Sequence, residues 1–381
     1  PFGWFWKDYG PMYCNINRNK YYVGLDLHNP EGQKIFHELT AISDVVEDNL
    51  RPGVMQSWNC GYDTLSKINP RIIFISKNGF GQWGQYAEEN RPSNDGAAQA
   101  LAGYAAMSCF PGHPPLKRMI WLCDYYGGLM GEVAIMAALH YRDRTGKGQY
   151  IEMSQSENIM RGMSWVWPYQ QITGKGAEPA GNRDVSICPA DTFRCIDDSF
   201  VALAAPAPEE FKGLCTAMGK PELVEDARFK DHLTRLKEEN ATEILRIVAE
   251  WVRSKTPAEV EELAEKHGFA ASRVCSAKDV VEDESYWERG SLVMNDDPIM
   301  GRYLYPEFPV NMSKTPPASR WNVRPVGFDN EYVLQSILTK TDAEIKHFYE
   351  VGAVGKYKEG VKGRCPPPDW DGKAGLIMAR E

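Results

Sequence analysis

The stretch WLCDYYGGLMGEVAIMAALHYRDRTGKGQYIEM (residues 121–153) decides how this chain folds. A single acid, Asp124, precedes Gly127 and Gly128, and the apolar run that follows predicts a helix from about Gly128. The basic turn around Gly146 is typical of the end of such a helix, and a strand-like run follows it. Asp124 is therefore expected at the mouth of a helix, beside glycines that let a ligand approach the backbone closely.

Asp124 has two interpretations on these residues. An acid at this position is ordinarily an N-cap, which satisfies free backbone amides of the helix. The same amides and the helix dipole would also stabilise a reactive carboxylate and a nearby oxyanion. A carboxylate so placed can attack an activated acyl group and form a covalent intermediate. The residues alone favour the cap, and both interpretations stay open at this point.

The segments before this stretch alternate between short apolar strands and helices. This order predicts an α/β domain with a largely parallel sheet. Ligands of such sheets usually bind beyond the carboxyl ends of the strands, so the loops after Asp48 and after Ser76 are expected to line a site. The predicted strands are 21–27, 44–48 and 71–76, and the predicted helices begin at Pro30 and Pro52 and cover 94–109.

Charged helices and short strands make up the chain after about residue 185. They predict a second, smaller α+β domain, whose charged helix faces are expected to be solvated. The predicted strands there are 199–205 and 269–274, and the predicted helices are 208–218, 241–254 and 257–267. We predict a large domain over 1–189, the smaller domain over 190–315, and a linker with a C-terminal segment that returns to the large domain over 316–381.

The composition excludes several classes of protein. The 381 residues carry a formal net charge of −9 with a pI near 5.5, which argues against a general nucleic-acid or anionic-membrane surface. No apolar run approaches the roughly 20 residues that a membrane-spanning helix needs. The nine cysteines form no CxxC pair and the seven histidines no HExxH motif, so we expect a cytoplasmic protein with reduced thiols and no metal.

Several motifs of this chain occur in one known family and in the same order. They include NRNKYYVGLDLHNPEG (17–32), DNLRPGVM (48–55), GYDTLSKINPRIIFISKNGFGQWGQYA (61–87), AAQALAG (97–103) and CDYYGGLMGEVAIMAALHYRDRTGKGQYIEMS (123–154). On these motifs the chain resembles the family III CoA-transferases of the CaiB–BaiF type, to which formyl-CoA:oxalate CoA-transferase belongs. The resemblance covers nearly the whole chain. It implies a Rossmann-like large domain, a smaller α+β domain and a dimer in which two ring-like chains interlock.

The resemblance also implies the chemistry. The acid of the family's D-x-x-x-G element is the nucleophile, which here corresponds to Asp124. It would attack a donor acyl-CoA to give a mixed anhydride, and the released CoA thiolate would then give an aspartyl-CoA thioester. An acceptor carboxylate repeats the sequence in reverse. The implied partners are acyl-CoA and a small carboxylic acid, with coenzyme A acting as a substrate and no cofactor bound permanently.

The loop from Asn49 to Gly53 matches the family's N-F-x-P-G element, which lines the CoA site. The resemblance implies that Asn49 and Leu50 contact the nucleotide or the pantetheine. Arg51 is a candidate partner for a phosphate, which guanidinium groups bind well, although a solvated loop charge explains it equally.

Further candidates for the CoA site follow in the sequence. Ser57 stands where formyl-CoA transferase carries an Arg, and Trp58 where it carries a Met. Trp58 could stack on adenine, but packing in the core or an interface is the simpler interpretation. Lys117 and Arg118, just before the Asp124 stretch, are further candidates for phosphate contacts.

Candidates for substrate contacts surround the predicted nucleophile. Gly79 and Phe80 belong to a loop that matches the family's S-G-F-G-Q element and would bend around the substrate, unless this loop is only a turn. Asp95 aligns with an acidic residue near the nucleophile in formyl-CoA transferase. It would either position the substrate or cap its own helix. Gly127 and Gly128 would leave room for the substrate beside Asp124.

One part of the family pattern is missing. The family opens with a strand and a glycine-containing turn beside the nucleophile, whereas Asn17 already matches a point inside the first domain. The first strand of the large domain is therefore expected to be absent from this chain, which begins without Met inside PFGWFWKDYG. This gap motivates one alternative function, a non-catalytic CoA-binding subunit of a hetero-oligomeric transferase. We expect a homodimer or a heterodimer of related subunits.

A second alternative is an enzyme similar to α-methylacyl-CoA racemase. Such an enzyme moves a proton with a His/Asp pair, and its His belongs to a G-H-D element upstream of the acid. This chain has Ser93, Asn94 and Asp95 there, and an Asn side chain cannot shuttle a proton. The sequence therefore favours transfer over racemisation.

Aromatic residues suggest the type of acceptor. They predict a bulky apolar or aromatic carboxylic acid, although packing in the core or in a dimer interface explains them equally well. The residues in question are Trp4, Phe5, Trp6, Trp165, Trp167 and Tyr169.

Overall fold

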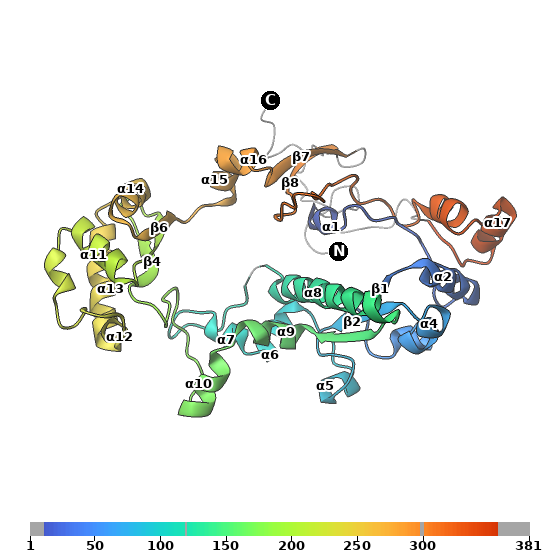
Figure 1. Cartoon of the computed structure of the whole chain (residues 1–381), viewed down its shortest axis with the longest axis horizontal. Coiled ribbons are helices and arrows are strands. Elements are labelled where there is room, and N and C mark those ends of the chain that lie inside the picture. Colours follow the sequence, from blue (N-terminus) through green and yellow to red (C-terminus); the bar gives the residue numbers. More distant parts are fainter. Residues whose placement is uncertain (1–10, 119, 298–300, 357–381) are drawn as a thin grey trace. The chain divides into compact units, whose positions relative to one another are not determined.

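The computed structural model describes residues 11–118, 120–297 and 301–356 (Figure 1). The chain forms two compact units, each built from segments that are separate in the sequence. Unit 1 contains 1–91, 129–153 and 278–381, and unit 2 contains 92–128 and 154–277. The domain division that we predicted from the sequence follows other boundaries and stays a prediction.

Unit 1 is built on a three-stranded sheet in the order β1-β2-β3. Strands β1 (Val45–Asp48) and β2 (Ile73–Asn78) run parallel, with Val45 opposite Ile73. The first four residues of β2 are fully buried, as expected for a parallel strand that is covered on both faces. The third strand, β3, spans Tyr150–Ser154. The parallel sheet predicted from the alternating pattern is thus present.

The loops after β1 and β2 lie side by side, as the carboxyl ends of parallel strands require. Ser76 Oγ donates to Asp48 Oδ2 over 2.5 Å, which joins the two strand ends. The Asn78 side chain donates to the carbonyl oxygen of Leu50 over 3.3 Å, which joins the two loops. The two loops that we expected to line a site therefore form one edge of unit 1.

Helices and a hairpin complete unit 1. The helix α2 begins at Pro30, as predicted, and Asn29 caps it by accepting from the amide of Glu31. Besides the sheet and the part of α8 (Leu122–Thr145) that follows residue 128, the elements of unit 1 are α1 (Pro11–Ile16), α2 (Pro30–Ile42), α3 (Val54–Ser57), α4 (Tyr62–Ile68), α5 (Gln85–Glu88), the hairpin β7 (Leu292–Asp297) and β8 (Gly301–Pro306), α16 (Glu284–Glu288), the π-helix η2 (Tyr332–Ile337) and α17 (Asp342–Glu350). The helix α15 (Ala277–Glu282) begins at the boundary of the units.

The strand predicted over residues 21–27 is wrong. The structure has only an isolated bridge there, between Leu25 and Val354. Side chains take the backbone donors that a ladder would use, because Tyr22 N donates to Asp329 Oδ2 and Gly24 N donates to Asn330 Oδ1. The sequence pattern of alternating residues could not reveal these partners, which lie far away along the chain.

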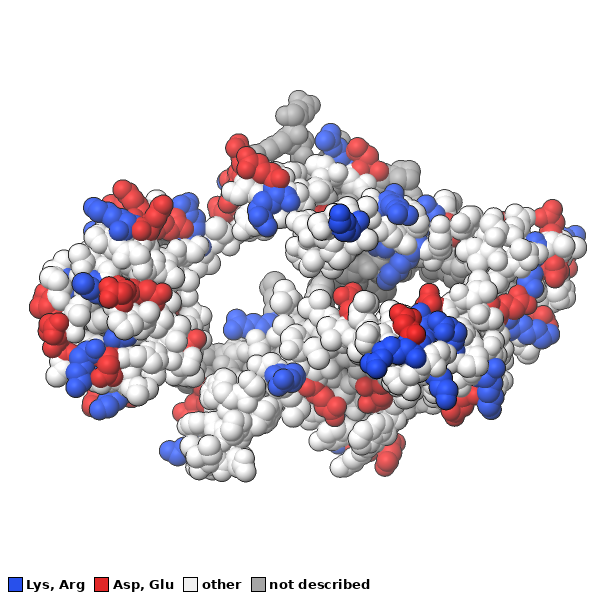
Figure 2. All heavy atoms as spheres, viewed as in Figure 1, with Lys and Arg blue, Asp and Glu red and all other residues white. Residues whose placement is uncertain are grey.

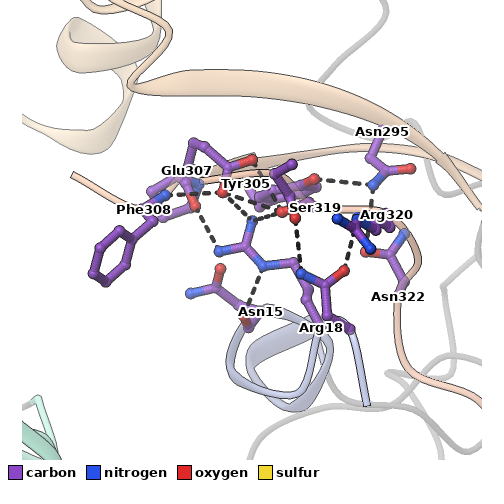
Figure 3. A network of polar contacts seen from close by, with 12 residues as sticks. Asn15, Arg18, Asn295, Tyr305, Glu307, Phe308, Ser319, Arg320 and Asn322 are labelled. Carbon is purple, nitrogen blue, oxygen red and sulfur yellow. Dashed lines mark hydrogen bonds and ion pairs between the residues drawn. The ribbon is translucent and has the colours of Figure 1, made fainter. Parts of the chain in front are cut away.

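Arg18 joins the N-terminal and C-terminal segments of unit 1 (Figure 3). Its guanidinium donates to Glu307 over 3.2 Å and to Ser319 over 3.0 Å, and it lies over the ring of Tyr305. Ser319 Oγ in turn donates to the Glu307 carboxylate. A planar group with several donors can hold these partners at once, which fixes α1 against the strand β8 and the segment that follows it.

Gly148 allows a close approach of two segments in unit 1. A Cβ at this position would lie 1.9 Å from the carbonyl oxygen of Ile72, and the Gly148 amide donates to Pro70 O over 2.9 Å. We expect Gly148→Ala to lower the free energy of unfolding by about 1–3 kcal/mol, because the backbone must move and strain this contact. Chemical denaturation measures the change. Gly176→Ala is the matched control, since its added Cβ meets no atom within 4 Å, and equal stability of the two variants would contradict the prediction.

Unit 2 contains an antiparallel sheet of β4 (Ala190–Arg194), β5 (Phe200–Ala204) and β6 (Ala270–Arg273). Apolar side chains of these strands and of the neighbouring helices form the largest core cluster described. The helices of unit 2 are α6 (Asp95–Leu101), α7 (Tyr104–Met107), α9 (Gln155–Gly162), α10 (Val166–Thr173), α11 (Pro208–Ala217), α12 (His232–Arg235), α13 (Glu238–Val252) and α14 (Pro257–His267), with the 3₁₀ helix η1 (Pro221–Val224).

Charged side chains of both signs are interspersed on the surface of α11 to α14 in unit 2 (Figure 2). On α13, Arg246 pairs with Glu243 and with Glu250, and all three side chains are partly or largely exposed. Exposed pairs at this spacing stabilise a helix by only about 0.3–0.5 kcal/mol each. The charged faces are solvated surface, as predicted from the sequence.

Candidate active site

Asp124 lies inside the first turn of a long helix and not before it. The helix α8 spans Leu122–Thr145, so the predicted start at about Gly128 is wrong. The helix begins earlier because Leu122 and Cys123 pack in an apolar cluster that fixes its first turn. Gly127 and Gly128 are interior helix positions, and their amides are not the free donors that we expected near Asp124. The predicted end is confirmed, since α8 stops before Gly146, whose φ is +74°.

Asp95 holds the start of α8 from another helix. Its side chain is 3% exposed, and its Oδ1 accepts from the backbone amide of Cys123 over 2.7 Å. Its Oδ2 accepts from the Gln99 side chain, also over 2.7 Å. Asn94 caps α6 by accepting from Ala97 N, so the interpretation of Asp95 as the cap of its own helix is wrong. Asp95 instead caps α8, the helix that carries Asp124.

Gln155 is the residue that sequence reasoning missed. The strand β3 ends at Ser154, and α9 begins at Gln155. The Gln155 side chain donates a hydrogen bond from Nε2 to Oδ1 of Asp124. The only signal in the sequence was its place directly after a strand end, where ligands of α/β proteins usually bind.

An apolar cluster in unit 2 brings the three helix starts together. It contains buried residues from α6, from the first turn of α8 and from α9, which carry Asp95, Asp124 and Gln155 respectively. The cluster consists of Ala98, Ala102, Cys123 and Ile159, with Tyr104, Leu122 and Met160 packed against it. The first turn of α8, which carries the exposed carboxylate of Asp124, is therefore held in place by close packing against α6 and α9.

Gly128 leaves space beside Asp124. It follows Asp124 by four residues, so the two lie on the same face of α8, one turn apart. A Cβ added to Gly128 would meet no atom within 4 Å. Gly127 lies on another side of the helix, where it is buried. Of the two glycines, Gly128 is the one whose position agrees with room for a substrate.

The thiol next to Asp124 gives a test of this local packing. Burial, with the nearby carboxylates of Asp95 and Asp124, raises the pKa of the Cys123 thiol to about 12. Such a thiol stays protonated at neutral pH, and only a thiolate reacts readily. We expect iodoacetamide to alkylate the exposed Cys275 while Cys123 stays unmodified in the native protein. Peptide mass spectrometry after a short exposure measures both, and equal labelling would contradict the packing.

Lys117 and Arg118, the candidates for phosphate contacts in unit 2, lie in the segment before α8. Arg118 N donates to Oε1 of Gln99 over 3.1 Å, which connects this segment to the helix of Asp95. The stem of Lys117 lies against Gly96, where an added Cβ would be 3.2 Å from it. Both side chains are exposed. Their part in phosphate binding stays a prediction.

The candidates for CoA contacts in unit 1 lie at the carboxyl edge of the sheet. Asn49 and Arg51 are exposed in the loop after β1, and Leu50 is half-buried. The Gln82 side chain donates to the carbonyl oxygen of Leu50 over 3.4 Å, which is a second link between the two loops. Phe80 is half-buried beside the ring of Tyr86.

Ser57 and Trp58 end the short helix after this loop. Ser57 is exposed and donates from Oγ to Val54 O. Trp58 is half-buried, packs against an apolar cluster of unit 1 and meets the ring of His28 edge-on at 4.9 Å. This packing occupies part of the indole surface. Stacking of Trp58 on adenine stays a prediction, as does the role of the buried Gly79.

Three of the six aromatic residues that suggested the type of acceptor lie within the described residues. Trp165 and Tyr169 meet edge-on with 5.9 Å between ring centroids, and both are partly exposed. Trp167 donates from its indole nitrogen to Met160 O. Trp4, Phe5 and Trp6 lie outside the described residues.

Clusters of metal-ligating side chains and membrane-spanning helices are both absent from the described residues. Within residues 11–118, 120–297 and 301–356, no three His, Cys, Asp or Glu side chains gather as metal ligands would. In the same part, every helix is too short or too polar to cross a membrane.

The structure is that of an α/β protein, and comparisons with known proteins give its family. The profile of CoA-transferase family III matches residues 3–330. A succinyl-CoA–D-citramalate CoA-transferase of Chloroflexus aurantiacus is 30% identical, over 87% of this chain and 81% of that protein. The β subunit of a succinyl-CoA–L-malate CoA-transferase from the same organism is 35% identical, over 86% and 81%. A CAIB/BAIF family protein from Brucella suis superposes with a TM-score of 0.72 at 26% identity, over 85% of this chain and 83% of that one. The chain belongs to CoA-transferase family III.

Proposed function

We propose that this protein transfers CoA from an acyl-CoA donor to a carboxylic acid, with Asp124 as the covalent nucleophile. One observation carries the proposal: an exposed carboxylate stands in the first turn of α8, and a neutral amide, that of Gln155, contacts it. An ionised carboxylate is the nucleophile, and a neutral amide donor does not compensate its negative charge as a cation would. The helix dipole stabilises that charge at this end of α8.

The proposed reaction uses only acyl exchange. Asp124 attacks the thioester carbonyl of the donor, and the CoA thiolate leaves with the electron pair of its C–S bond. The thiolate then attacks the side-chain carbon of Asp124 and expels the donor as a carboxylate, which gives an aspartyl-CoA thioester. The acceptor carboxylate attacks this thioester, and the thiolate returns to the acceptor carbonyl. Asp124 leaves as the free carboxylate.

The loops of unit 1 are the proposed CoA site. Asn49 and Leu50 would contact the nucleotide or the pantetheine, and Arg51 would pair with a phosphate. Their support is that the two strand-end loops are held together at the carboxyl edge of a parallel sheet, the usual place for a ligand. Ser57, Trp58, Lys117 and Arg118 are further proposed contacts.

The substrate side of the site is proposed to use Gly79, Phe80, Gly127 and Gly128. Of these, Gly128 has the most direct support, since space remains beside it on the face of α8 that carries Asp124. Asp95 would position the substrate indirectly, through the amide of Cys123 that it holds.

The acceptor is proposed to be bulky or aromatic. The partly exposed pair of Trp165 and Tyr169 supports this choice. Two relatives carry the names of D-citramalate and L-malate transferases, so a panel of acceptors must include both kinds of acid. Transfer to the small dicarboxylic acids alone would contradict an aromatic acceptor.

The assembly is proposed to be a dimer, of two identical chains or of two related ones, and its location the cytoplasm. Support for a paired assembly comes from the relatives named as the α and β subunits of one transferase. Light scattering of the purified chain gives the mass, and a monomer with full activity would contradict the proposal.

Racemisation has less support than transfer. The position that carries the His of a racemase is Asn94, whose side chain caps α6 by accepting from Ala97 N. Exchange of the substrate's α-proton with solvent, measured by NMR in D₂O, would favour the racemase.

Trapping the intermediate tests the function. We expect hydroxylamine, added during turnover with an acyl-CoA donor, to convert Asp124 to a hydroxamate that peptide mass spectrometry detects. The donor alone, without an acceptor, must already give the adduct, because the first half-reaction needs no acceptor. Absence of the adduct in a preparation that binds CoA would favour the non-catalytic subunit.

A further inference from the structure

We propose that Gln155 is a catalytic residue, whose amide stabilises the negative charge that develops on Oδ1 of Asp124 during transfer. This inference rests on the proposed function, because it concerns reactions at the side-chain carbon of Asp124. In the anhydride and in the thioester, Asp124 is itself the acyl group under attack. Gln155 would supply the hydrogen-bond donor that the resulting oxyanion needs.

The position of Gln155 is fixed by the elements on both sides of it. The buried Ser154 ends β3 and caps α9, accepting from the amide of Glu157. Its hydroxyl also contacts the Ser156 hydroxyl at 2.9 Å. On the other side of the contact, Asp95 holds the amide of Cys123 and with it the first turn of α8. Both ends of the hydrogen bond between Gln155 and Asp124 are thus attached to rigid, buried supports.

The hydrogen bond distinguishes the two oxygens of Asp124. Since Gln155 donates to Oδ1, attack on the donor is assigned to Oδ2. The mixed anhydride then contains Oδ2 as its bridging oxygen and Oδ1 as the carbonyl oxygen of Asp124. The Gln155 amide remains a donor to Oδ1 throughout, because a carbonyl oxygen accepts as a carboxylate oxygen does.

The chemical benefit arises when Asp124 is itself attacked. The CoA thiolate adds to the side-chain carbon, and the π electrons of the carbonyl move to Oδ1, which becomes an oxyanion. This intermediate collapses when the carbon–Oδ2 bond of the anhydride passes its electrons to the departing donor carboxylate. The acceptor carboxylate later adds to the thioester in the same way and expels the thiolate. In both steps the amide of Gln155 faces the new negative charge.

An amide suits this role better than a charged side chain. A Lys or Arg at this position would bind the ionised Asp124 strongly and lower its reactivity toward the donor. A neutral N–H binds the resting carboxylate more weakly and gains strength as charge concentrates on Oδ1. The interaction is therefore stronger in the transition state than in the ground state.

Replacing Gln155 tests the proposal. Gln155→Met keeps the length of the side chain without a donor, and Gln155→Ala removes it. Both are expected to slow formation of the aspartyl-CoA thioester in a single turnover by about 10²–10³-fold, the usual effect of losing one oxyanion donor. The KM for the donor is expected to stay within about threefold, because the interaction belongs to the transition state. Gln171→Ala, an exposed Gln→Ala change on α10, is the matched control and should behave as the wild type.

Gln155→Glu adds a readout that a structural role would not change. An ionised Glu would repel Asp124, whereas a protonated Glu can donate to Oδ1. The rate of this variant is therefore expected to rise as the pH falls from neutral, while the Gln155→Met variant keeps the wild-type pH profile.

The outcomes separate this inference from the proposed function. Formation of the aspartyl-CoA thioester at the wild-type rate in Gln155→Met overturns the role of Gln155 and leaves the transfer reaction intact. Absence of the Asp124 hydroxamate after hydroxylamine trapping in the wild type overturns the proposed function and this inference together. Formation of the aspartyl-CoA thioester about 10²–10³-fold more slowly in Gln155→Met than in the wild type supports both.

Discussion

Replacing Asp124 with Asn is expected to lower the turnover of CoA transfer by at least about 10⁴-fold, because an amide cannot form the anhydride. The fold should persist, since Asp124 is exposed and its charge at the helix start stabilises α8 by only about 0.3–1 kcal/mol. The measurement is CoA exchange between a donor and an acceptor acid, followed by chromatography. Binding of CoA, measured by calorimetry, should change little.

Two controls make the Asp124 result decisive. Glu132→Gln removes an exposed acid from the same helix and should keep wild-type turnover. Asp124→Ala should be as inactive as Asp124→Asn, which excludes activity recovered by deamidation of the Asn. Exchange at wild-type rates in Asp124→Ala would remove Asp124 from the chemistry.

Replacing Asp95 with Ala is expected to affect both stability and turnover. The change leaves the buried amide of Cys123 and the side chain of Gln99 without the acceptors that they have now. Loss of these two hydrogen bonds should lower the free energy of unfolding by about 2–3 kcal/mol. The first turn of α8 would also lose its cap, so Asp124 moves relative to Gln155. We expect turnover to fall by about 10²-fold, the usual consequence of a shift near 1 Å.

Neighbouring variants separate the two effects of Asp95. Asp95→Asn keeps an acceptor for the Cys123 amide and should restore most of the turnover. Asn94→Ala removes the cap of α6 and should cost about 1 kcal/mol of stability without changing turnover. Thermal unfolding and steady-state kinetics measure these changes. Normal turnover in Asp95→Ala would show that the start of α8 does not depend on this carboxylate.

The geometry around Asp124 bears on the two interpretations of this acid, a helix cap or a nucleophile. Asp124 lies in the first turn, but the backbone amide of Cys123 at the same helix start donates to Asp95. Asp124 itself contacts the neutral amide of Gln155 and stays exposed. One carboxylate fixes the helix, and the other is presented at the surface. This division of roles supports the nucleophile interpretation over the cap.

The sequence by itself determined the parts that depend on local pattern. The alternation of apolar runs predicted the parallel pair β1 and β2, and Pro30 predicted the start of α2. Gly146 predicted the end of α8, because a left-handed residue commonly follows the last turn of a helix. The family motifs predicted Asp124 as the nucleophile, which stays a prediction. These features follow from residues that are close together in the chain.

The tertiary structure decided what depends on partners far away in the sequence. The helix α8 begins at Leu122, whereas we predicted from the sequence a start at about Gly128. Packing of Leu122 and Cys123, with the hydrogen bond from the Cys123 amide to Asp95, outweighs the low helix propensity of two glycines. Gln155 belongs to none of the motifs, and its contact with Asp124 joins residues 31 positions apart in the sequence. Local pattern thus predicted β1, β2, the start of α2 and the end of α8, whereas packing determined the start of α8 and which side chains meet at the candidate site.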